Sequence, residues 1–310
     1  MHRPALGCRA LSDDLTDRPR RGPGRLSPAA RLAARLAPLR AWSPAPVPRA
    51  SLWLHGVAAL GIVAEPQHWP QMLAVLAGNH AVLGALMHPR STQLGPNLVA
   101  LPGTMGKAVA LTFDDGPDPE VTPRVLDLLD RHGATASFFV IGRKAARHGA
   151  LLREIGRRGH TIENHSYHHA KSFACRGPWA LRREVVLTQR AVAEATGVAP
   201  RFFRAPMGLR SPLLDPVLAL EGLQLVSWTR RGYDGRGDDP GRVLDRLTRG
   251  LAARDILLLH DGTPGTRPRG EAAVLAVLPP LLARCAAAGL RVGSLAPVAA
   301  RASPAAAAGR

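Results

Sequence analysis

Two apolar stretches that carry no charge lie in the first third of the chain. Residues 51–64 and 69–87 contain no Lys, Arg, Asp or Glu, and Pro66 lies between them. A proline ring disfavours continuation of a helix, so the pattern predicts two helices joined near residues 65–67. The second run is close to the ~20 residues that a membrane-spanning helix needs, whereas the first is short for one. The polar interruptions in the second run are Gln71, Asn79 and His80.

The two predicted helices have two interpretations. As a membrane hairpin they would be apolar on all outer faces, with Trp53 and Trp69 near the lipid–water interface. As a soluble extension they would bury one face on the following domain and expose their polar residues. Arg49 and Arg90 flank the pair on both sides, so the charges do not set an orientation. The sequence leaves both interpretations open.

The pattern from Lys107 onward alternates between short apolar runs and stretches with apolar residues at helical spacing. The strand-like runs are 107–113, 134–142, 161–166, 201–206, 223–228, 256–262 and 290–295, and the helical ones include 123–133, 143–160, 178–197, 239–255 and 271–289. Such alternation predicts an α/β fold with a parallel sheet covered by helices, built as a barrel or as a doubly wound sheet. We expect this domain to span 105–298, after an apolar helical segment at 51–100 and before a flexible tail at 299–310.

The first fifty residues differ from the rest in composition. They contain ten Arg against three Asp in a chain of net charge +18, and they are rich in Pro with few large apolar residues. This composition predicts a disordered N-terminal segment at 1–50. The Arg residues are scattered without interleaved aromatic residues, so no nucleic-acid partner is expected. Three widely spaced Cys give no disulfide framework, and no standard signal peptide is expected at the start.

Chemically active side chains follow one predicted strand after another. The set comprises Asp114, Asp115, His165, His169, Arg204, Asp234 and His260. In parallel α/β folds the carboxyl ends of the strands share one side of the sheet, so these side chains should meet there. Asp and His are residues of metal binding and proton transfer, and their concentration predicts a catalytic site.

The segment "HSYHH" (165–169) offers imidazoles at a spacing of four. One helical turn would place His165 and His169 on the same side, where neutral imidazoles suit zinc and similar divalent ions. The spacing alone is a weak signal, but a carboxylate from another strand end would complete a two-histidine, one-carboxylate ligand set. One member of the pair Asp114–Asp115 could coordinate the metal, while the other could accept a proton from water.

Four motifs in order resemble those of the polysaccharide deacetylase family, the NodB homology domain of carbohydrate esterase family four. They are "TFDDG" (112–116), "HSYHH" (165–169), "RAPMG" (204–208) and "LLLHDG" (257–262), within a similarity that covers 107–295. The resemblance implies a distorted (β/α) barrel and metal-dependent removal of an N- or O-acetyl group from a sugar. It further implies that Asp115, His165 and His169 hold the metal, most often zinc, with cobalt or a similar ion as an alternative.

The resemblance also implies roles for the other residues. Asp114 would be the general base, oriented by Arg204, and His260 would be the general acid that protonates the leaving amine. Asp234 would lie near His260 and favour its protonated form. Asp238 or Asp239 could fill that role instead.

The substrate groove departs from the family pattern. The family usually has Tyr after the Pro of "RAP", whereas this chain has Pro206 followed by Met207, whose backbone N–H is the expected oxyanion donor. The usual Trp after the fourth-motif Asp is replaced by Gly235. Leu259 is the residue expected to line the pocket for the acetyl methyl group. These departures bear on the substrate more than on the reaction.

Three functions remain in competition. The leading interpretation is a metal-dependent deacetylase of a cell-envelope polysaccharide or glycan, with an acetylated carbohydrate as its partner. The second keeps the same machinery but acts on a lipid-linked sugar, with membrane association through residues 51–88. The third is an inactive glycan-binding module, which the full set of ligands, base and acid disfavours. Membrane or cell-envelope localisation is favoured, and a cytoplasmic location is left open.

Overall fold

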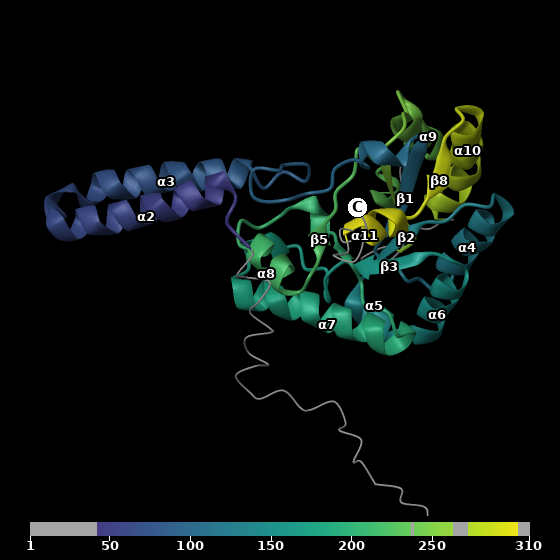
Figure 1. Ribbon diagram of the computed structural model, residues 1–310, viewed down its shortest axis with the longest axis horizontal. Helices are drawn as coiled ribbons and strands as arrows, with labels where there is room; N and C mark the ends of the chain where they lie inside the picture. Colours follow the sequence, from purple (N-terminus) through teal and green to yellow (C-terminus); the bar gives the residue numbers. More distant parts are fainter. Residues whose placement is uncertain (1–41, 237–238, 263–271, 303–310) are drawn as a thin grey trace, which may run out of the picture. The chain divides into compact units, whose positions relative to one another are not determined.

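The strands form one curled, all-parallel sheet. The computed structural model describes residues 42–236, 239–262 and 272–302. Within these residues the strands are β1 (Ala108–Asp114), β2 (Ser137–Val140), β3 (Thr161–Asn164), β4 (Phe202–Phe203), β5 (Gln224–Leu225), β6 (Arg230–Arg231), β7 (Ile256–His260) and β8 (Arg291–Gly293). Their order is β5-β4-β3-β2-β1-β7-β6, with β8 also pairing with β1 (Figure 1).

This strand order decides between the two predicted architectures. Strands β1 to β5 are added in one direction, without the central reversal that defines a doubly wound sheet. The sheet therefore has the half-barrel form of the predicted (β/α) barrel, with helices on its outer face. Two parts of the pattern differ from expectation. The strand predicted at 223–228 contributes only Gln224–Leu225, and β6 at Arg230–Arg231 was not foreseen.

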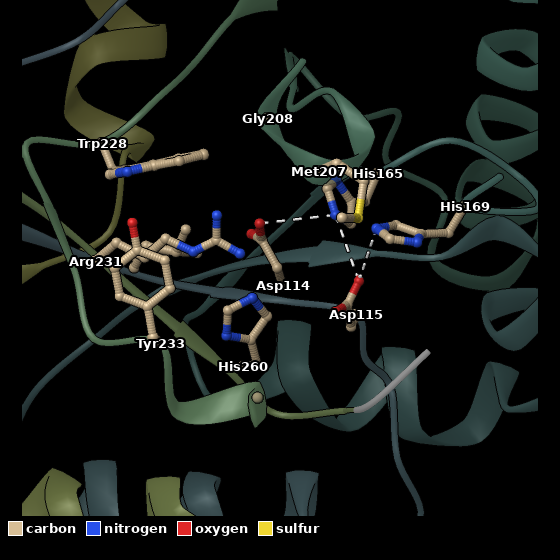
Figure 2. A pocket seen from close by; sticks show the side chains of 12 residues that line it. Asp114, Asp115, His165, His169, Met207, Gly208, Trp228, Arg231, Tyr233 and His260 are labelled. Carbon is tan, nitrogen blue, oxygen red and sulfur yellow. Dashed lines mark ion pairs between the residues drawn. The ribbon is translucent and has the colours of Figure 1, made fainter. Parts of the chain in front are cut away.

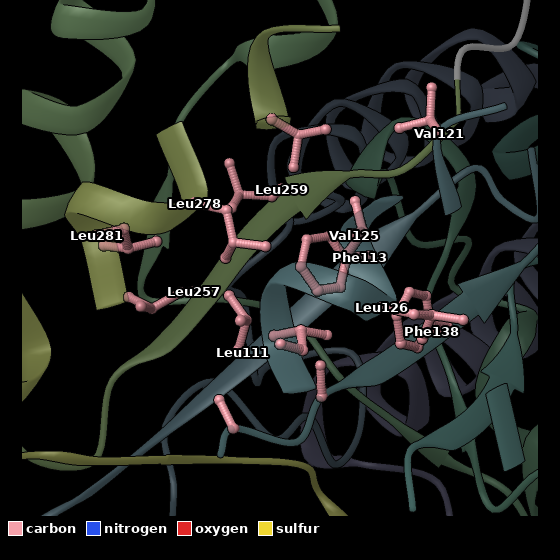
Figure 3. Close-up of a cluster of buried hydrophobic side chains, with 14 of the residues drawn as sticks. Leu111, Phe113, Val121, Val125, Leu126, Phe138, Leu257, Leu259, Leu278 and Leu281 are labelled. Carbon is pink, nitrogen blue, oxygen red and sulfur yellow. The ribbon is translucent and has the colours of Figure 1, made fainter. Parts of the chain in front are cut away.

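Alternation along the strands separates two hydrophobic layers. Leu111 and Phe113 of β1 and Leu257 and Leu259 of β7 pack toward the helices, in the cluster of Figure 3. Leu258, between the last two, packs on the opposite face of the sheet. Because every residue of β1 is buried, this strand is a rigid support for whatever follows its carboxyl end.

The helices that follow the strands are mostly those predicted. They are α4 (Thr122–Arg131), α5 (Gly142–Arg147), α6 (Gly149–Arg157), α7 (Pro178–Thr196), α8 (Leu214–Leu220), α9 (Pro240–Thr248), α10 (Ala273–Ala287) and α11 (Ala296–Ala302). The stretch predicted as one helix at 143–160 is two helices. His148 leaves the helical conformation there, and its carbonyl accepts the first hydrogen bonds of α6. Helix α11 begins before, and extends into, the expected flexible tail at 299–310; residues 303–310 lie outside the described part.

The charge-free stretches form a helical hairpin before the barrel. Helix α2 (Pro46–Ala64) and helix α3 (Trp69–Ala85) lie side by side, joined by the turn η1 (Pro66–His68) (Figure 1). The break falls at Pro66, as the sequence indicates. Helix α2 starts within the segment expected to be disordered at 1–50, so that boundary was placed too late; residues 1–41 lie outside the described part. In the described part, α2 alone meets the length and composition of a membrane-spanning helix, a weak indication by itself.

The hairpin buries the polar Ser51 and exposes most of its large apolar side chains. Ser51 is buried between the helices and accepts a hydrogen bond from the Asn79 amide at 2.9 Å. The rings of His55 and His80 meet edge to face at 5.1 Å between their centroids. The large apolar side chains that remain exposed are Leu52, Trp53, Val57, Leu60, Val63, Trp69, Leu73, Val75 and Val82. So many exposed apolar side chains on a helix pair are unfavourable in water.

The base of the hairpin is attached to the barrel by polar contacts. The buried Arg210 guanidinium donates to the carbonyl oxygens of Ser91 at 3.0 Å and Gly95 at 3.1 Å, in the segment after α3. Before α2, the Trp42 indole donates to the Asp215 carboxylate at 2.7 Å. Both ends of the hairpin are therefore held by the loop and helix that follow β4.

Candidate active site

Strand pairing brings the predicted catalytic residues together. Asp114 at the end of β1 is the direct register partner of His260 at the end of β7. His165 follows β3 immediately, and Arg204 follows β4, whose residue Phe203 pairs with Asn164. All four side chains therefore emerge at the carboxyl ends of neighbouring parallel strands, as the sequence predicts.

A backbone conformation allows two adjacent aspartates to face one cleft. In a strand, consecutive side chains point to opposite faces. Asp115 leaves the strand with φ of 72°, in the left-handed region that non-glycine residues rarely adopt. This turn places Asp115 beside Asp114 on the lining of the same cleft. Such conformations are costly and concentrate at functional sites, where surrounding structure holds them in place.

Asp115, His165 and His169 form a compact cluster with the geometry of a metal site. The Asp115 Oδ1 atom lies 3.4 Å from His165 Nε2 and 3.2 Å from His169 Nε2 (Figure 2). One ligand atom from each residue lies within 4.8 Å of the other two, and all three residues are buried. Asp115 Oδ1 has no hydrogen-bond partner among the described residues. A buried, unsatisfied carboxylate oxygen facing two imidazoles is well suited to a divalent cation.

A loop, rather than the expected helical turn, makes the two histidines converge. The segment after β3 is irregular, with left-handed conformations at Ser166 (φ of 62°) and His169 (φ of 53°). Helical spacing was therefore the wrong reason for their proximity. His165 is oriented by its other ring nitrogen, since Nδ1 lies 2.8 Å from the Arg204 carbonyl oxygen. With Nδ1–H donating there, the lone pair of Nε2 points into the cluster.

Glu184 of α7 holds this loop from behind. Its buried carboxylate accepts backbone N–H bonds from Tyr167 at 3.0 Å and His168 at 2.8 Å, and it pairs with Arg176 at 2.7 Å. The His168 ring also turns toward Glu184, away from the cluster. Sequence reasoning did not single out Glu184, because a glutamate on an amphipathic helix normally faces solvent.

The pKa shifts in the cluster favour the protonation states that metal ligands need. Burial raises the pKa of Asp115, but the nearby His165 imidazole and the charges of His260 and His169 lower it by more, so Asp115 remains ionised. Burial and the neighbouring His165 lower the pKa of His169 to about 4, which keeps this imidazole neutral at physiological pH. For His165, burial opposes charging, but Asp114 and Asp115 raise the pKa. The site therefore attracts positive charge, either a proton or a cation.

Asp114 is fixed by Arg204. The guanidinium donates from Nη1 to Asp114 Oδ1 at 2.6 Å and to the Thr112 hydroxyl at 2.9 Å. It also donates to the Ser227 carbonyl oxygen at 2.9 Å and packs 4.1 Å from the Phe139 ring centroid. Burial lowers the pKa of Arg204 and Asp114 counteracts this effect. The second Asp114 oxygen stays 3.7 Å from His165 Nε2, at the edge of the cluster.

Next to Asp114 in the same cleft, His260 is held by Asp234. Asp234 Oδ1 lies 2.8 Å from His260 Nδ1, and Oδ2 accepts the His260 backbone N–H at 2.8 Å. Burial lowers the pKa of His260, but the Asp234 charge outweighs it and raises the value to about 9. Asp239 is exposed and caps α9 through the Arg242 N–H, so it is not the partner of His260. Asp238 lies outside the described residues.

The walls of the cleft differ partly from expectation. Met207 and Gly208 line one side and Trp228, Arg231 and Tyr233 the other (Figure 2). Gly208 has φ of 75°, and an added Cβ would clash with the Trp228 ring and lie 2.9 Å from Pro89, so glycine is required there.

Two residues expected at the substrate site lie elsewhere. Leu259 packs in the hydrophobic core, and its neighbour Leu258 lines the cleft instead, because side chains alternate along β7. Pro206 is buried in the short turn that presents Met207 and does not line the cleft itself. Arg231 and Tyr233 were missed, although the polar run "TRRGYD" after a predicted strand end was a usable signal.

Part of the chain is similar to known proteins of one family. Residues 102–226 match the family model described as polysaccharide deacetylase. A chitooligosaccharide deacetylase of Sinorhizobium fredii is 37% identical over 163 residues, which cover 52% of this chain and 75% of that protein. A peptidoglycan-N-acetylglucosamine deacetylase of Bacillus cereus is 32% identical over 187 residues, or 59% of this chain and 66% of that protein.

Solved structures show the same fold. A family 4 carbohydrate esterase from Streptomyces lividans superposes with a TM-score of 0.55 at 31% identity, covering 61% of this chain and 92% of that one. A pseudoenzyme of the same esterase family from Bacillus anthracis gives 0.58 at 22% identity, covering 64% and 67%, and shows likeness of fold alone. The chain belongs to the polysaccharide deacetylase family and is a hydrolase of that type.

Proposed function

We propose that the protein removes an N- or O-acetyl group from a carbohydrate of the cell envelope with the help of a bound divalent metal ion. The observation that carries the proposal is that the Asp115–His165–His169 cluster lines the same cleft as Asp114 and His260, which are neighbours at the ends of β1 and β7. Relatives named as chitooligosaccharide and peptidoglycan N-acetylglucosamine deacetylases support an N-acetylated amino sugar as the substrate.

The residues present fit a metal ion. The unsatisfied Asp115 Oδ1 and the Nε2 atoms of His165 and His169 would be its three protein ligands, and zinc suits this set best, with cobalt as an alternative. When bound, such an ion supplies Lewis acidity that polarises the acetyl carbonyl and makes water more acidic.

Asp114 is suited to accept the proton of the attacking water. Its Oδ1 is occupied by Arg204 at 2.6 Å, so Oδ2 is the oxygen left toward the cleft. The guanidinium also fixes the rotamer of the carboxylate, which keeps the base in position before substrate arrives. Arg204 thus acts through Asp114 and is a positioning residue.

His260 is suited to protonate the leaving amine. An amine leaves only as its protonated form, so an acid is needed in the same cleft as the base. Because Asp234 raises the pKa of His260 to about 9, the imidazolium is the main form at neutral pH. We assign the oxyanion donor to the Met207 backbone N–H, since Met207 lines the cleft beside the cluster. Leu258, rather than Leu259, is positioned for the acetyl methyl group.

The test combines metal content with acetate release. The full-length protein, loaded with zinc or cobalt, should release acetate from chitooligosaccharides or peptidoglycan fragments. His169→Ala should lose metal binding measured by calorimetry, whereas His132→Ala, at an exposed helix end, should bind as the parent does. Asp114→Asn should retain metal and lose activity. Metal binding without acetate release from any acetylated glycan would favour the inactive glycan-binding alternative.

We propose in addition that the α2–α3 hairpin inserts into a lipid bilayer. Its exposed apolar side chains and its internal Ser51–Asn79 hydrogen bond support this, because lipid, unlike water, favours polar groups inside a helix pair. A 19-residue helix is about 28 Å long, close to the hydrocarbon thickness of a bilayer. Trp69 lies at the tip, but Trp53 lies two turns into α2 rather than at its end.

Fractionation of the full-length chain tests the insertion. We expect recovery with membranes, resistance to extraction by high salt, and release by detergent. Replacing exposed Val57 and Leu60 by Lys should move the protein to the soluble fraction. A matched control replaces Arg124 and Arg143 of the barrel by Gln, which should leave the partition unchanged. Recovery of the parent in the soluble fraction at low salt without detergent would rule the hairpin insertion out.

A further inference from the structure

An arginine that takes no part in the proposed chemistry lies inside the active-site cleft. Arg231 ends β6 and lines the same cleft as Asp114 and His260. Its guanidinium carbon lies 5.2 Å from the Trp228 ring centroid and 4.9 Å from that of Tyr233. Figure 2 shows the side chain extending between these two rings toward the side of the cleft where Asp114 lies. Contacts with two aromatic faces fix the position of the guanidinium.

The charge of Arg231 lacks a counter-ion among the residues that the structure describes. No ion pair involving Arg231 occurs among them, and its Nε atom is buried without a hydrogen-bond partner. The neighbouring Arg230 is different, since it pairs with Asp255 and donates to backbone carbonyl oxygens. Arg204 is equally well satisfied by its partners. Arg230 and Arg204 thus have carboxylate partners within the protein, whereas Arg231 has none among the described residues.

Holding an unpaired cation partly out of water is unfavourable unless a bound ligand neutralises its charge and accepts its hydrogen bonds. A guanidinium presents a planar set of N–H donors that matches the oxygens of a phosphate or carboxylate. The aromatic rings cover its faces, so its donors are directed along the cleft. The position next to the proposed base and acid places such a ligand group beside the reacting sugar.

We propose that Arg231 binds an anionic oxygen group, a phosphate or a carboxylate, that the substrate carries next to its acetylated sugar. This inference rests on the proposed function and narrows it from acetylated carbohydrates in general to acidic amino sugars. Tyr233, which is partly exposed at the rim, would pack against the sugar unit between the anionic group and the acetamide. A neutral homopolymer of N-acetylglucosamine leaves Arg231 without its partner and is a poorer substrate.

The experiment compares matched substrates on metal-loaded, full-length protein. The neutral substrate is the methyl glycoside of N-acetylglucosamine. The anionic substrates are the same sugar with a 1-phosphate and the same sugar with an O-linked lactyl carboxylate. We expect kcat/KM for an anionic substrate to exceed that for the neutral one by about tenfold or more. The better of the two anionic substrates identifies the source of the charge.

Variants separate binding of the anion from other roles of the residue. Arg231→Gln should abolish the preference, because kcat/KM falls much more on the anionic substrates than on the neutral sugar, while Arg231→Lys should retain part of it. Arg242→Gln removes an exposed charge on nearby α9 and should behave as the parent. The proposal is overturned if the parent shows no preference. It is also overturned if Arg231→Gln lowers activity equally on all substrates, because Arg231 would then act on Asp114 or on the fold.

A binding measurement keeps this inference separate from the proposed function. Calorimetry with glucosamine 1-phosphate and with methyl glucosaminide requires no turnover. Tighter binding of the phosphate by the parent than by Arg231→Gln, decreasing with added salt, supports the anion site even if no acetate is released from any substrate. Equal binding of the phosphate by the two proteins refutes it, even if the protein is an active deacetylase.

Discussion

The pairing of His260 with Asp234 makes a prediction about the pH dependence of activity. Asp234 accepts two hydrogen bonds from His260, one from the ring and one from the backbone, each at 2.8 Å. Asp234→Asn preserves the size of the side chain and removes its charge. The amide oxygen can still accept the ring N–H, but the N–H bond from the His260 backbone loses its acceptor. The variant therefore tests mainly the electrostatic contribution of the carboxylate.

The expected magnitude follows from the pKa of His260. Its value of about 9, against 6.5 for an unperturbed imidazole, corresponds to about 3 kcal/mol in favour of the imidazolium. Without the Asp234 charge the pKa should return to about 6.5 or below, because burial continues to disfavour the charged form. At pH 7.5 about one variant molecule in ten would then carry the proton, so kcat/KM should fall about tenfold. At pH 6 the variant and the parent should agree within about twofold.

The measurement is kcat/KM for acetate release between pH 5.5 and 9.5, at saturating metal, with the His260 ring titrated in parallel by NMR. The alkaline limb should move from about pH 9 toward 6.5. Asp239→Asn removes the same charge from the exposed cap of α9 and should leave the limb in place. An unmoved alkaline limb in Asp234→Asn, with the NMR pKa still near 9, would refute the assignment of His260 and Asp234.

Three further substitutions test Arg204 and Glu184, which support the site, and Glu163 of β3, which accepts the backbone N–H groups of Arg201 and Phe202 at 2.9 Å. Arg204→Lys should lower kcat/KM about a hundredfold without metal loss, because an ammonium group cannot retain every bond that orients Asp114. Glu163 has a pKa raised by burial to about 7, so the folded protein holds a proton that the unfolded chain releases near 4.5. Unfolding free energy should thus fall by about 3 kcal/mol as pH rises through this window, and Glu163→Gln should remove that loss in urea titrations at pH 5 and 8. Glu184→Gln should weaken zinc affinity about tenfold by loosening the loop that carries His169.

Each of these expectations has a contrary result. Loss of zinc from Arg204→Lys would mean that the arginine supports the metal cluster rather than the base. Identical pH dependence of unfolding in Glu163→Gln and the parent would mean that the carboxyl group is not protonated in the fold. Unchanged zinc affinity in Glu184→Gln would show that the loop is rigid without that charge.

The sequence was most informative about residues whose position follows from hydrophobic periodicity and from the ends of the predicted strands. The position of Asp114, His165 and His260 follows from three apolar runs that must become neighbouring parallel strands. The sequence was less informative about which face of a strand a side chain occupies and about the conformation of loops. A shift of one residue along β7 separates Leu258 in the cleft from Leu259 in the core. The motif "LLLHDG" (257–262) does not distinguish the two positions, because both residues are leucine.

Loop conformation was the second feature that the sequence did not predict. The proximity of His165 and His169 depends on left-handed residues in an irregular loop, and helical spacing gave the correct pair for the wrong reason. The partners that fix the site come from distant positions, such as Glu184 on α7 behind that loop. Arg231 could not be distinguished from Arg230 in the sequence, since only the fold shows which of the two has an acceptor.

The hairpin also has a consequence for topology. In the linear sequence Arg49 and Arg90 flank the apolar stretches on opposite sides, but folding α2 against α3 brings both to the same end, while the tip carries Glu65 and His68. For an inserted hairpin the positive-inside rule then places its base, and the barrel joined to it, on the cytoplasmic face. Protease protection of the barrel in intact cells would test this sidedness. A catalytic cleft on that face would meet sugars before export, when they are still attached to phosphate and lipid, rather than finished polymer outside.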